Sequence, residues 1–184
     1  MINIKKHSMA IIAATAAAAA FVPSASQAAD GTITFSGTIT SQTCTISGNG
    51  QGPNFTVTLP TVSESALASS GAVAGRTPFT IALTNCDPDS GPVATYFEPG
   101  VTVNPSTGQL LNATGSATNV EVGLLNSDTS QIMLGQAIAS QNSRPTTIAS
   151  GSASLNYFAQ YVAVNGGSTA GSVDTTVMYS MAYQ

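Results

Sequence analysis

The sequence predicts an all-β sandwich, because short runs of alternating apolar and polar residues recur between clusters of turn-forming residues. The expected strands lie at 31–40, 53–60, 77–86, 118–126, 153–164 and 173–183. Glycine, proline, asparagine and aspartate gather between them, at 47–53, 87–92, 104–109 and 165–171. Only 61–70 has a helical pattern, and it is long enough for no more than a short helix. Many short strands with this punctuation are typical of two packed sheets.

The first 28 residues predict a secretory signal peptide that is not part of the fold. Lys5 and Lys6 provide a positive start, and the apolar stretch 9–22 that follows is too short to span a membrane. Small residues then lead to a cleavage site after Ala28, with a cut after Ala29 as the alternative. The remaining chain has the length of one domain, and we expect no membrane span in it.

Removal of this signal peptide changes the charge of the chain, because both lysines and the only histidine leave with it. Arg76 and Arg144 then remain against eight acidic residues, which gives a net charge of −6. Two cations are too few for a surface that binds nucleic acid or an anionic membrane. Neither a Ser-His nor a Ser-Lys pair can form, so the sequence predicts a protein that is not an enzyme and needs no cofactor or metal.

One close pair of carboxylates remains, Asp87 and Asp89 on either side of Pro88. Such a pair can act as general acid and base, or can bind calcium. Asp, Pro, Ser and Gly are also the residues that turns require for local backbone reasons. The favoured interpretation is therefore a turn between two strands, with an acidic-dyad hydrolase as a minor alternative.

The two cysteines of the chain, Cys44 and Cys86, predict one disulfide in an exported protein. Metal binding is the alternative interpretation, but two thiolates without a histidine do not complete a zinc site. Closing a loop of this length should stabilise the fold by about 4 kcal/mol, through the lost entropy of the unfolded chain.

Two strands at the ends of the exported chain each have one continuous apolar or β-favouring face. The first would be about 30 Å long, and its apolar face holds Gly31, Ile33, Phe35, Gly37 and Ile39. The last has a face formed by Val173, Thr175, Val177, Tyr179, Met181 and Tyr183. Residues 175–184 lack the charge or proline that normally protects a free strand edge.

These features together resemble the subunits of chaperone-usher fimbriae, the type 1 pilin family. The matching residues are 29–39 leading to Cys44, 79–86 ending on Cys86, the strand 157–164, Gly171 fourteenth from the end, and the penultimate Tyr183. The resemblance covers nearly the whole exported chain and is loosest over 90–150. It implies an incomplete immunoglobulin-like sandwich of six strands at 41–184, preceded by a donor-strand extension at 29–40.

The resemblance also implies roles for the residues of the two terminal strands. Gly31, Ile33, Phe35, Gly37 and Ile39 would be the donor face that enters a neighbouring subunit. Gly171, Val173, Thr175, Val177, Tyr179, Met181 and Tyr183 would form the acceptor strand. A periplasmic pilus chaperone and an outer-membrane usher would contact this strand before the neighbouring pilin subunit does.

A chain of this family would be exported through the periplasm and would polymerise into a fimbria on the cell surface that serves adhesion. The expected role is the major shaft subunit, and a minor or tip-adaptor subunit is the alternative.

A self-contained secreted module, immunoglobulin-like or lectin-like, is the competing hypothesis. In that case 31–40 is an ordinary first strand, which pairs with 173–183 of the same molecule and closes its own sandwich. The two hypotheses therefore differ in whether the last strand finds a partner within the single chain.

Overall fold

The computed structural model describes residues 32–37 and 43–183. These residues belong to two units, the short segment 32–37 and a domain formed by 43–183, and each is described by itself. The expected signal peptide at 1–28, its cleavage site, Gly31 and Ile39 lie outside the described residues. Neither helical turn of the described chain has the length and hydropathy needed to cross a membrane.

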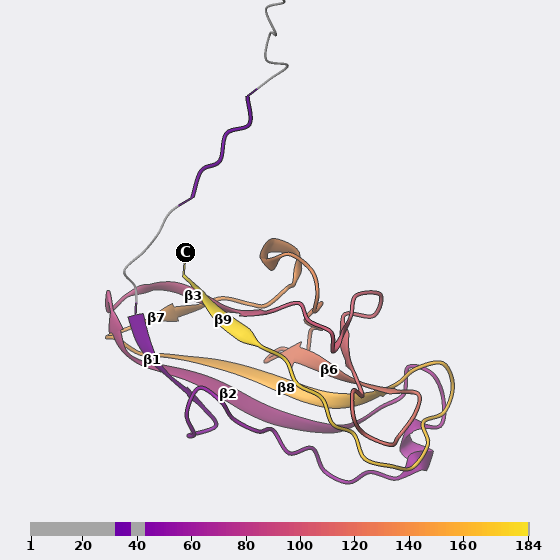
Figure 1. The fold of residues 1–184 in the computed structure, drawn as a ribbon. Helices are drawn as coiled ribbons and strands as arrows, with labels where there is room; N and C mark the ends of the chain where they lie inside the picture. Colours follow the sequence, from indigo (N-terminus) through magenta and orange to yellow (C-terminus); the bar gives the residue numbers. More distant parts are fainter. Residues whose placement is uncertain (1–31, 38–42, 184) are drawn as a thin grey trace, which may run out of the picture. The chain divides into compact units, whose positions relative to one another are not determined.

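The domain consists almost entirely of β-strands, which confirms the predicted fold class (Figure 1). The strands are β1 (Thr43–Gly48), β2 (Val73–Asp87), β3 (Gly91–Phe97), β4 (Val103–Asn104), β5 (Gln109–Leu111), β6 (Val120–Asn126), β7 (Thr146–Ile148), β8 (Ala153–Ala163) and β9 (Tyr179–Tyr183). Two 3₁₀ turns, η1 (Glu64–Leu67) and η2 (Ile138–Ser140), complete the described elements. β4, β5 and β7 are only two or three residues long, so the longer strands form the framework.

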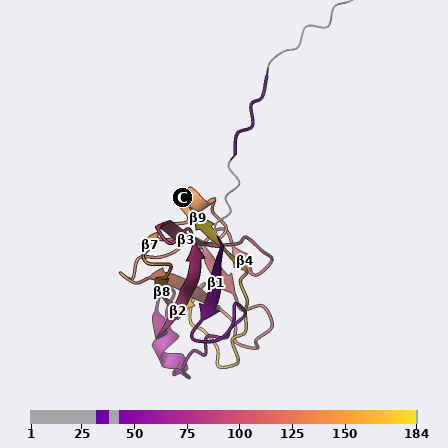
Figure 2. The same ribbon diagram turned by 90° about the vertical axis from the view of Figure 1, so that its left-hand side faces the viewer.

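The strands form two antiparallel sheets. One sheet has the order β1-β2-β8-β6-β5-β4, and the other has the order β7-β3-β9. Figure 1 shows β2 and β8 as long neighbouring strands of the first sheet, with β3 and β9 in the second layer, and Figure 2 gives the side view. This order places β9 at the edge of its sheet, with β3 as its partner strand.

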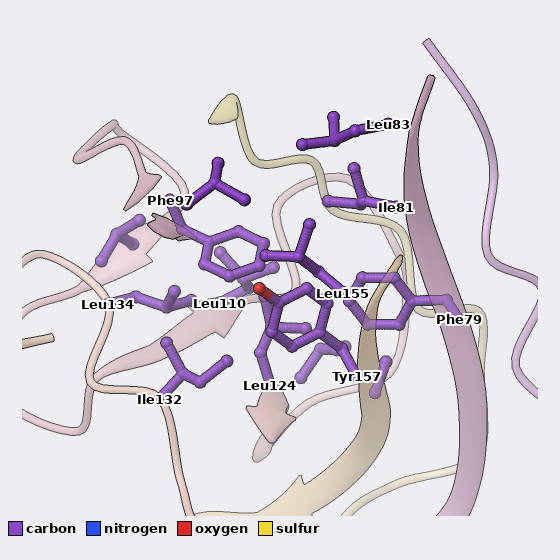
Figure 3. Packing of buried hydrophobic residues seen from close by; sticks show 14 of the residues in the cluster. Phe79, Ile81, Leu83, Phe97, Leu110, Leu124, Ile132, Leu134, Leu155 and Tyr157 are labelled. Carbon is purple, nitrogen blue, oxygen red and sulfur yellow. The ribbon is translucent and has the colours of Figure 1, made fainter. Parts of the chain in front are cut away.

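The hydrophobic core lies between the two sheets (Figure 3). Phe79, Ile81 and Leu83 alternate along β2 and are buried, as a strand with one covered face requires. The Tyr157 ring of β8 packs against Phe79 and Phe97, with ring centroids 5.4 and 5.6 Å apart. Residues from both layers thus form one apolar cluster.

The disulfide between Cys44 and Cys86 is present, as predicted, and it joins β1 to β2. The two strands are also paired in a ladder, from Thr43 opposite Asp87 to Gly48 opposite Ile81. The bond therefore fixes the edge strand β1 to the body of the larger sheet.

Asp87 ends β2, and Asp89 lies in the short connection to β3. Both residues are exposed, and the Asp89 carbonyl oxygen accepts a hydrogen bond from the Gly151 N–H at 2.9 Å. This arrangement is that of the expected turn. Among the residues that the structure describes, no three His, Cys, Asp or Glu side chains gather in a way that could hold a metal ion.

Strand predictions from the sequence are confirmed at 77–86, 118–126 and 153–164, which correspond to β2, β6 and β8. The helical pattern at 61–70 corresponds to η1. Three other predicted strands differ from the structure. Residues 32–37, the described part of 31–40, form no strand, 53–60 joins no sheet, and 173–183 forms a ladder only within β9. The last two differences concern the same region of the domain.

Candidate functional site

Among the residues that the structure describes, strand β9 has a partner on one edge only. It pairs with β3 in the register that places Tyr179 opposite Phe97 and Tyr183 opposite Val93. One residue earlier, the Glu98 N–H donates to the Met178 carbonyl oxygen at 2.8 Å. Hydrogen-bonded and non-bonded pairs alternate in an antiparallel ladder, so the N–H and C=O groups of the odd-numbered residues in β9 point away from β3.

The segment that leads into β9, residues 172–178, continues the same pattern. The Asp174 carbonyl oxygen accepts from the Ala113 N–H at 2.9 Å, and the Thr176 carbonyl oxygen accepts from the Thr102 hydroxyl at 2.6 Å. Within the described chain, no hydrogen bond reaches the N–H or C=O groups of Val173, Thr175 and Val177. The backbone groups of the even-numbered residues are thus hydrogen-bonded to the subunit itself, and those of the odd-numbered residues point the other way. We call residues 173–183, with these unbonded odd-numbered groups, the acceptor edge.

Side chains along the acceptor edge alternate in burial. The odd-numbered residues are half-buried, and their apolar members pack on the main core cluster: Val173, Val177, Tyr179, Met181 and Tyr183. Asp174, Thr176 and Met178 between them are exposed, and Met178 has 72% of its surface accessible. A core that is only half covered at these residues has room for further apolar side chains.

A second extended segment, residues 53–60, lies beside the same part of the core. Its odd-numbered residues Phe55, Val57 and Leu59 are half-buried against the main cluster, and its even-numbered residues are exposed. This is the alternation of a strand, yet no backbone hydrogen bond reaches residues 54–60 from elsewhere in the described chain. The sequence predicted the alternation of 53–60 but not that the segment would be left unpaired.

The two unpaired segments come together at both ends. At one end the Tyr179 hydroxyl donates to the Pro53 carbonyl oxygen at 2.7 Å, and the rings of Tyr179 and Phe55 meet edge to face at 6.2 Å. At the other end a cavity of about 340 Å³ is lined by both 61–64 and 169–173. Residues 53–60 and 173–179 therefore run antiparallel to each other over a common apolar floor. Within the described residues, no strand pairs with 53–60 or with the facing edge of 173–179.

Gly171 lies two residues before the acceptor edge, at a point where no side chain fits. A Cβ atom at this position would lie 2.5 Å from the backbone nitrogen of Ala117, closer than real contacts allow. Glycine here permits the chain to pass directly beside the 115–117 loop. The close approach gives a physical reason for the glycine that the sequence singled out.

The odd-numbered residues of the acceptor edge carry no charged side chain at neutral pH, and its one acidic residue, Asp174, lies on the exposed even-numbered face. Burial raises the pKa of the Tyr179 and Tyr183 hydroxyls above the ordinary tyrosine value of 10.0. Because folding raises these two pKa values, the tyrosines leave the stability of the fold unchanged at pH values below 10. The fold loses stability as the pH rises above 10 and through the higher pKa of the folded chain. A partner of this edge therefore meets backbone groups and neutral side chains.

The predicted donor residues that the structure describes lie in the segment 32–37. Ile33 and Phe35 are exposed, with 80% and 89% of their surface accessible, and Gly37 has no atom within 4 Å of a Cβ position. The predicted acceptor residues, in contrast, lie together on one edge of the domain. Such an edge can form a backbone ladder with one further strand whose apolar side chains fit the half-covered core.

Comparison with known proteins gives a consistent result. The family model described as type-1 fimbrial protein, A matches residues 59–184. The major fimbrial subunit SMF-1 of Stenotrophomonas maltophilia is 50% identical over 170 residues, which covers 89% of this chain and 98% of that protein. The F17 fimbrial protein of Escherichia coli is 45% identical over 172 residues, which covers 90% of this chain and 94% of that protein.

A solved structure shows the same fold. The P pilus rod subunit PapA superposes with a TM-score of 0.58 at 20% identity, covering 77% of this chain and 99% of that one. The match of the family model to more than half of the chain, together with relatives of this identity and coverage, shows that the chain belongs to the type-1 fimbrial protein family.

Proposed function

We propose that this chain is the major shaft subunit of a fimbria and that it polymerises by donor-strand exchange. In each junction the extension 29–40 of one copy would lie along the acceptor edge of the next copy. The observation that carries the proposal is the free acceptor edge, with its odd-numbered backbone groups unbonded in the described chain beside the unpaired segment 53–60.

The donor segment has the length and pattern that the acceptor edge requires. From Gly31 to Ile39 an extended chain spans about 26 Å, and the acceptor edge spans about 33 Å. Burying Ile33, Phe35 and Ile39 would provide roughly 5 to 9 kcal/mol before the cost of ordering the segment. Threonine and serine occupy the alternate positions, where they would face solvent.

The same contact repeated from copy to copy produces a filament. Donor and acceptor are different surfaces of one chain, and a heterologous contact that does not close into a ring generates an open polymer. A relative that is 50% identical is named as a major fimbrial subunit, and the PapA structure is that of a rod subunit. Both support a shaft role over a minor or tip-adaptor role.

An unpaired apolar edge also explains why this chain would need partners before assembly. A free strand edge over an incomplete core is prone to pair with any other exposed strand. A periplasmic chaperone would cover the acceptor edge of the newly exported chain, and an outer-membrane usher would exchange it for the donor of the next subunit. Export with residues 1–28 as the signal peptide fits the disulfide, which requires an oxidising compartment.

A chain that carries its own donor tests the proposal. We expect that appending residues 29–41 to the C-terminus through a short flexible linker gives a soluble monomer that no longer polymerises and melts at a higher temperature. The control carries aspartate at both Ile33 and Phe35 of the appended copy only, and should still polymerise. Continued polymerisation of the first fusion, with an unchanged melting temperature, would refute donor-strand exchange.

The competing self-contained module makes the opposite prediction for a deletion. Removing residues 29–40 should unfold a closed sandwich, because it loses one of its own strands. The same deletion in a pilin should leave a chain that a pilus chaperone still binds but that does not polymerise. Insolubility of the deleted chain even with a chaperone present would favour the closed module.

Substitution of Thr175 with valine should strengthen the junction. The Thr175 hydroxyl is buried in the acceptor edge, and it has no hydrogen-bond partner in the described chain. Removing an unsatisfied buried hydroxyl while keeping the side-chain shape should stabilise by about 1 kcal/mol. The melting temperature of the fusion with its appended donor measures this effect, and Thr176→Val on the exposed face is the matched control. A lower melting temperature for Thr175→Val than for the control would show that the hydroxyl is bonded in the junction.

A further inference from the structure

Asn112 follows β5 and is bonded to the beginning of the acceptor edge. Its side-chain nitrogen donates to the carbonyl oxygens of Ala117 and Ser172, at 2.8 and 3.0 Å. Its side-chain oxygen accepts from the backbone N–H groups of Gly115 and Asp174, at 3.1 and 2.8 Å. Both donor positions and both acceptor positions of the amide are thus occupied, and two of the four bonds reach residues 172–174.

Further hydrogen bonds join the same two segments. Ser116 and Ser172 bond reciprocally, each backbone N–H donating to the hydroxyl of the other, at 3.1 and 3.0 Å. The Ala117 N–H also donates to the Ser172 carbonyl oxygen at 3.0 Å. Together with the bonds of Asn112, these contacts form what we call the staple between 112–117 and 172–174.

The two segments are so close at the staple that glycine is needed on both sides. A Cβ atom at Gly115 would collide with the Ser172 carbonyl oxygen and with the Asn112 side chain. Gly171 is restricted in the same way by the backbone of Ala117. The staple is therefore a specific close contact and not an incidental meeting of two loops.

The position of the staple suggests what it does. It holds residues 172–174 from the even-numbered side only, so the odd-numbered groups of the acceptor edge stay free. It also lies at the open end of the acceptor edge, where Ala117, Gly171, Ser172 and Val173 line the cavity of about 340 Å³. A segment with no ladder partner would otherwise have to be ordered when the donor arrives, at a cost in conformational entropy for each residue.

We propose that Asn112 is a positioning residue for donor-strand capture, which keeps the start of the acceptor edge extended before any partner is bound. This inference rests on the proposed function of the edge. Preorganisation lowers the cost of binding, so Asn112 acts chiefly on the rate at which a donor is captured. Once the donor is paired, its own ladder holds residues 172–174, and the rate of donor release depends little on Asn112.

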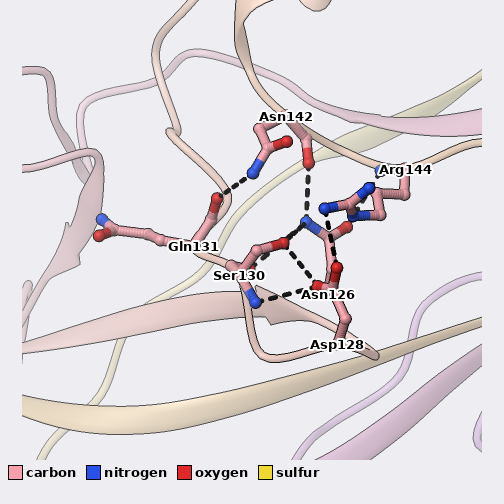
Figure 4. A network of polar contacts seen from close by, with 6 residues as sticks. All are labelled: Asn126, Asp128, Ser130, Gln131, Asn142 and Arg144. Carbon is pink, nitrogen blue, oxygen red and sulfur yellow. Dashed lines mark hydrogen bonds and ion pairs between the residues drawn. The ribbon is translucent and has the colours of Figure 1, made fainter.

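The domain offers a matched control in Asn126 at the end of β6 (Figure 4). Its side-chain nitrogen donates to the Ser130 hydroxyl at 3.0 Å and the Asn142 carbonyl oxygen at 2.7 Å, and its side-chain oxygen accepts from the Arg144 N–H at 3.0 Å. Asp128 completes this network through an ion pair with Arg144 at 2.8 Å. Hydrogen bonds from Ser130, and to a smaller extent the positive charge of Arg144, lower the pKa of Asp128. Asn126 is therefore as richly bonded as Asn112, but none of its bonds reaches the acceptor edge.

The test uses the exported chain 29–184 at low concentration with a large excess of a fluorescent peptide of residues 29–41. Fluorescence anisotropy gives the rates of peptide capture and release for the unaltered chain, Asn112→Ala and Asn126→Ala. We expect capture by Asn112→Ala to slow by at least about tenfold relative to Asn126→Ala, because a factor of ten corresponds to the ordering cost of about one residue. Release rates of the two variants should agree within about twofold.

The possible outcomes test the positioning role of Asn112 and the proposed function separately. Equal capture rates for the two alanine variants would overturn the positioning role and leave Asn112 as a structural residue. Failure of the unaltered chain to take up the peptide would instead contradict the proposed function. If Asn112→Ala does not fold, the double variant Ser116→Ala and Ser172→Ala removes only the reciprocal bonds of the staple. It should slow capture to a smaller extent, and unchanged capture by this variant would also overturn the inference.

Discussion

Replacing Phe35 with aspartate should abolish fibre growth and leave the fold of the subunit unchanged. Phe35 is 89% exposed in the single chain, so the domain does not depend on it for its own core. In the proposed junction the same side chain is buried on the apolar floor of the acceptor edge, where an unpaired carboxylate is strongly disfavoured. The loss of a buried aromatic side chain alone costs about 3 to 5 kcal/mol, and electron microscopy with sedimentation would show whether fibres form.

The neighbouring residue provides the control for this substitution. Thr34→Asp introduces the same charge one residue earlier, on the opposite face of the donor strand. It should polymerise nearly as well as the unaltered chain, because that face points to solvent in the junction. Equal inhibition by Phe35→Asp and Thr34→Asp would mean that added charge, and not burial of the apolar face, prevents assembly.

Replacing Cys44 and Cys86 together with serine should lower the free energy of unfolding by about 4 kcal/mol. The disulfide closes a loop with a sequence separation of 42 residues, so its loss gives the unfolded chain much more conformational freedom. Denaturant unfolding of the fusion with its appended donor measures the change without interference from polymerisation. A loss below about 1 kcal/mol would show that the β1 and β2 ladder alone fixes these segments.

Treating the unaltered fusion with a thiol reductant is the companion measurement. The reduced chain should lose stability to a similar extent, and the double serine variant should not respond to the reductant. A large response of the serine variant would point to an effect of the reagent and not of the bond.

The sequence predicted β2 and β8 well because each contains a stretch of clear alternation. β2 and β8 each bury every second residue over much of their length, so their period of two was visible without any knowledge of their partners. β3 was not predicted, because Val93, Ala94 and Thr95 are buried in succession after a Gly-Pro start that resembles a turn. β6 is also buried at successive residues and was nevertheless predicted, so the turn-like start, and not consecutive burial alone, concealed β3.

The sequence predicted the last strand of the candidate site but not the other segments that complete the site. The face from Val173 to Tyr183 was visible as alternation at the end of the chain, and the structure shows it as one half-buried edge. The facing segment 53–60 was predicted as a strand, but its lack of a partner depends on which segments meet in space. Asn112 carried no signal in the sequence, since a loop asparagine resembles any other turn residue.

The division of the last strand into odd and even positions has a consequence for how this chain can vary. In the proposed junction the odd positions would serve two molecules, since each side chain packs on the core of its own subunit and would receive the strand of a neighbour. The side chains at even positions such as Thr176 and Met178 face outward on the subunit. Substitutions of the outward side chains should therefore be tolerated, while substitutions of the inward side chains of the same short segment should impair assembly.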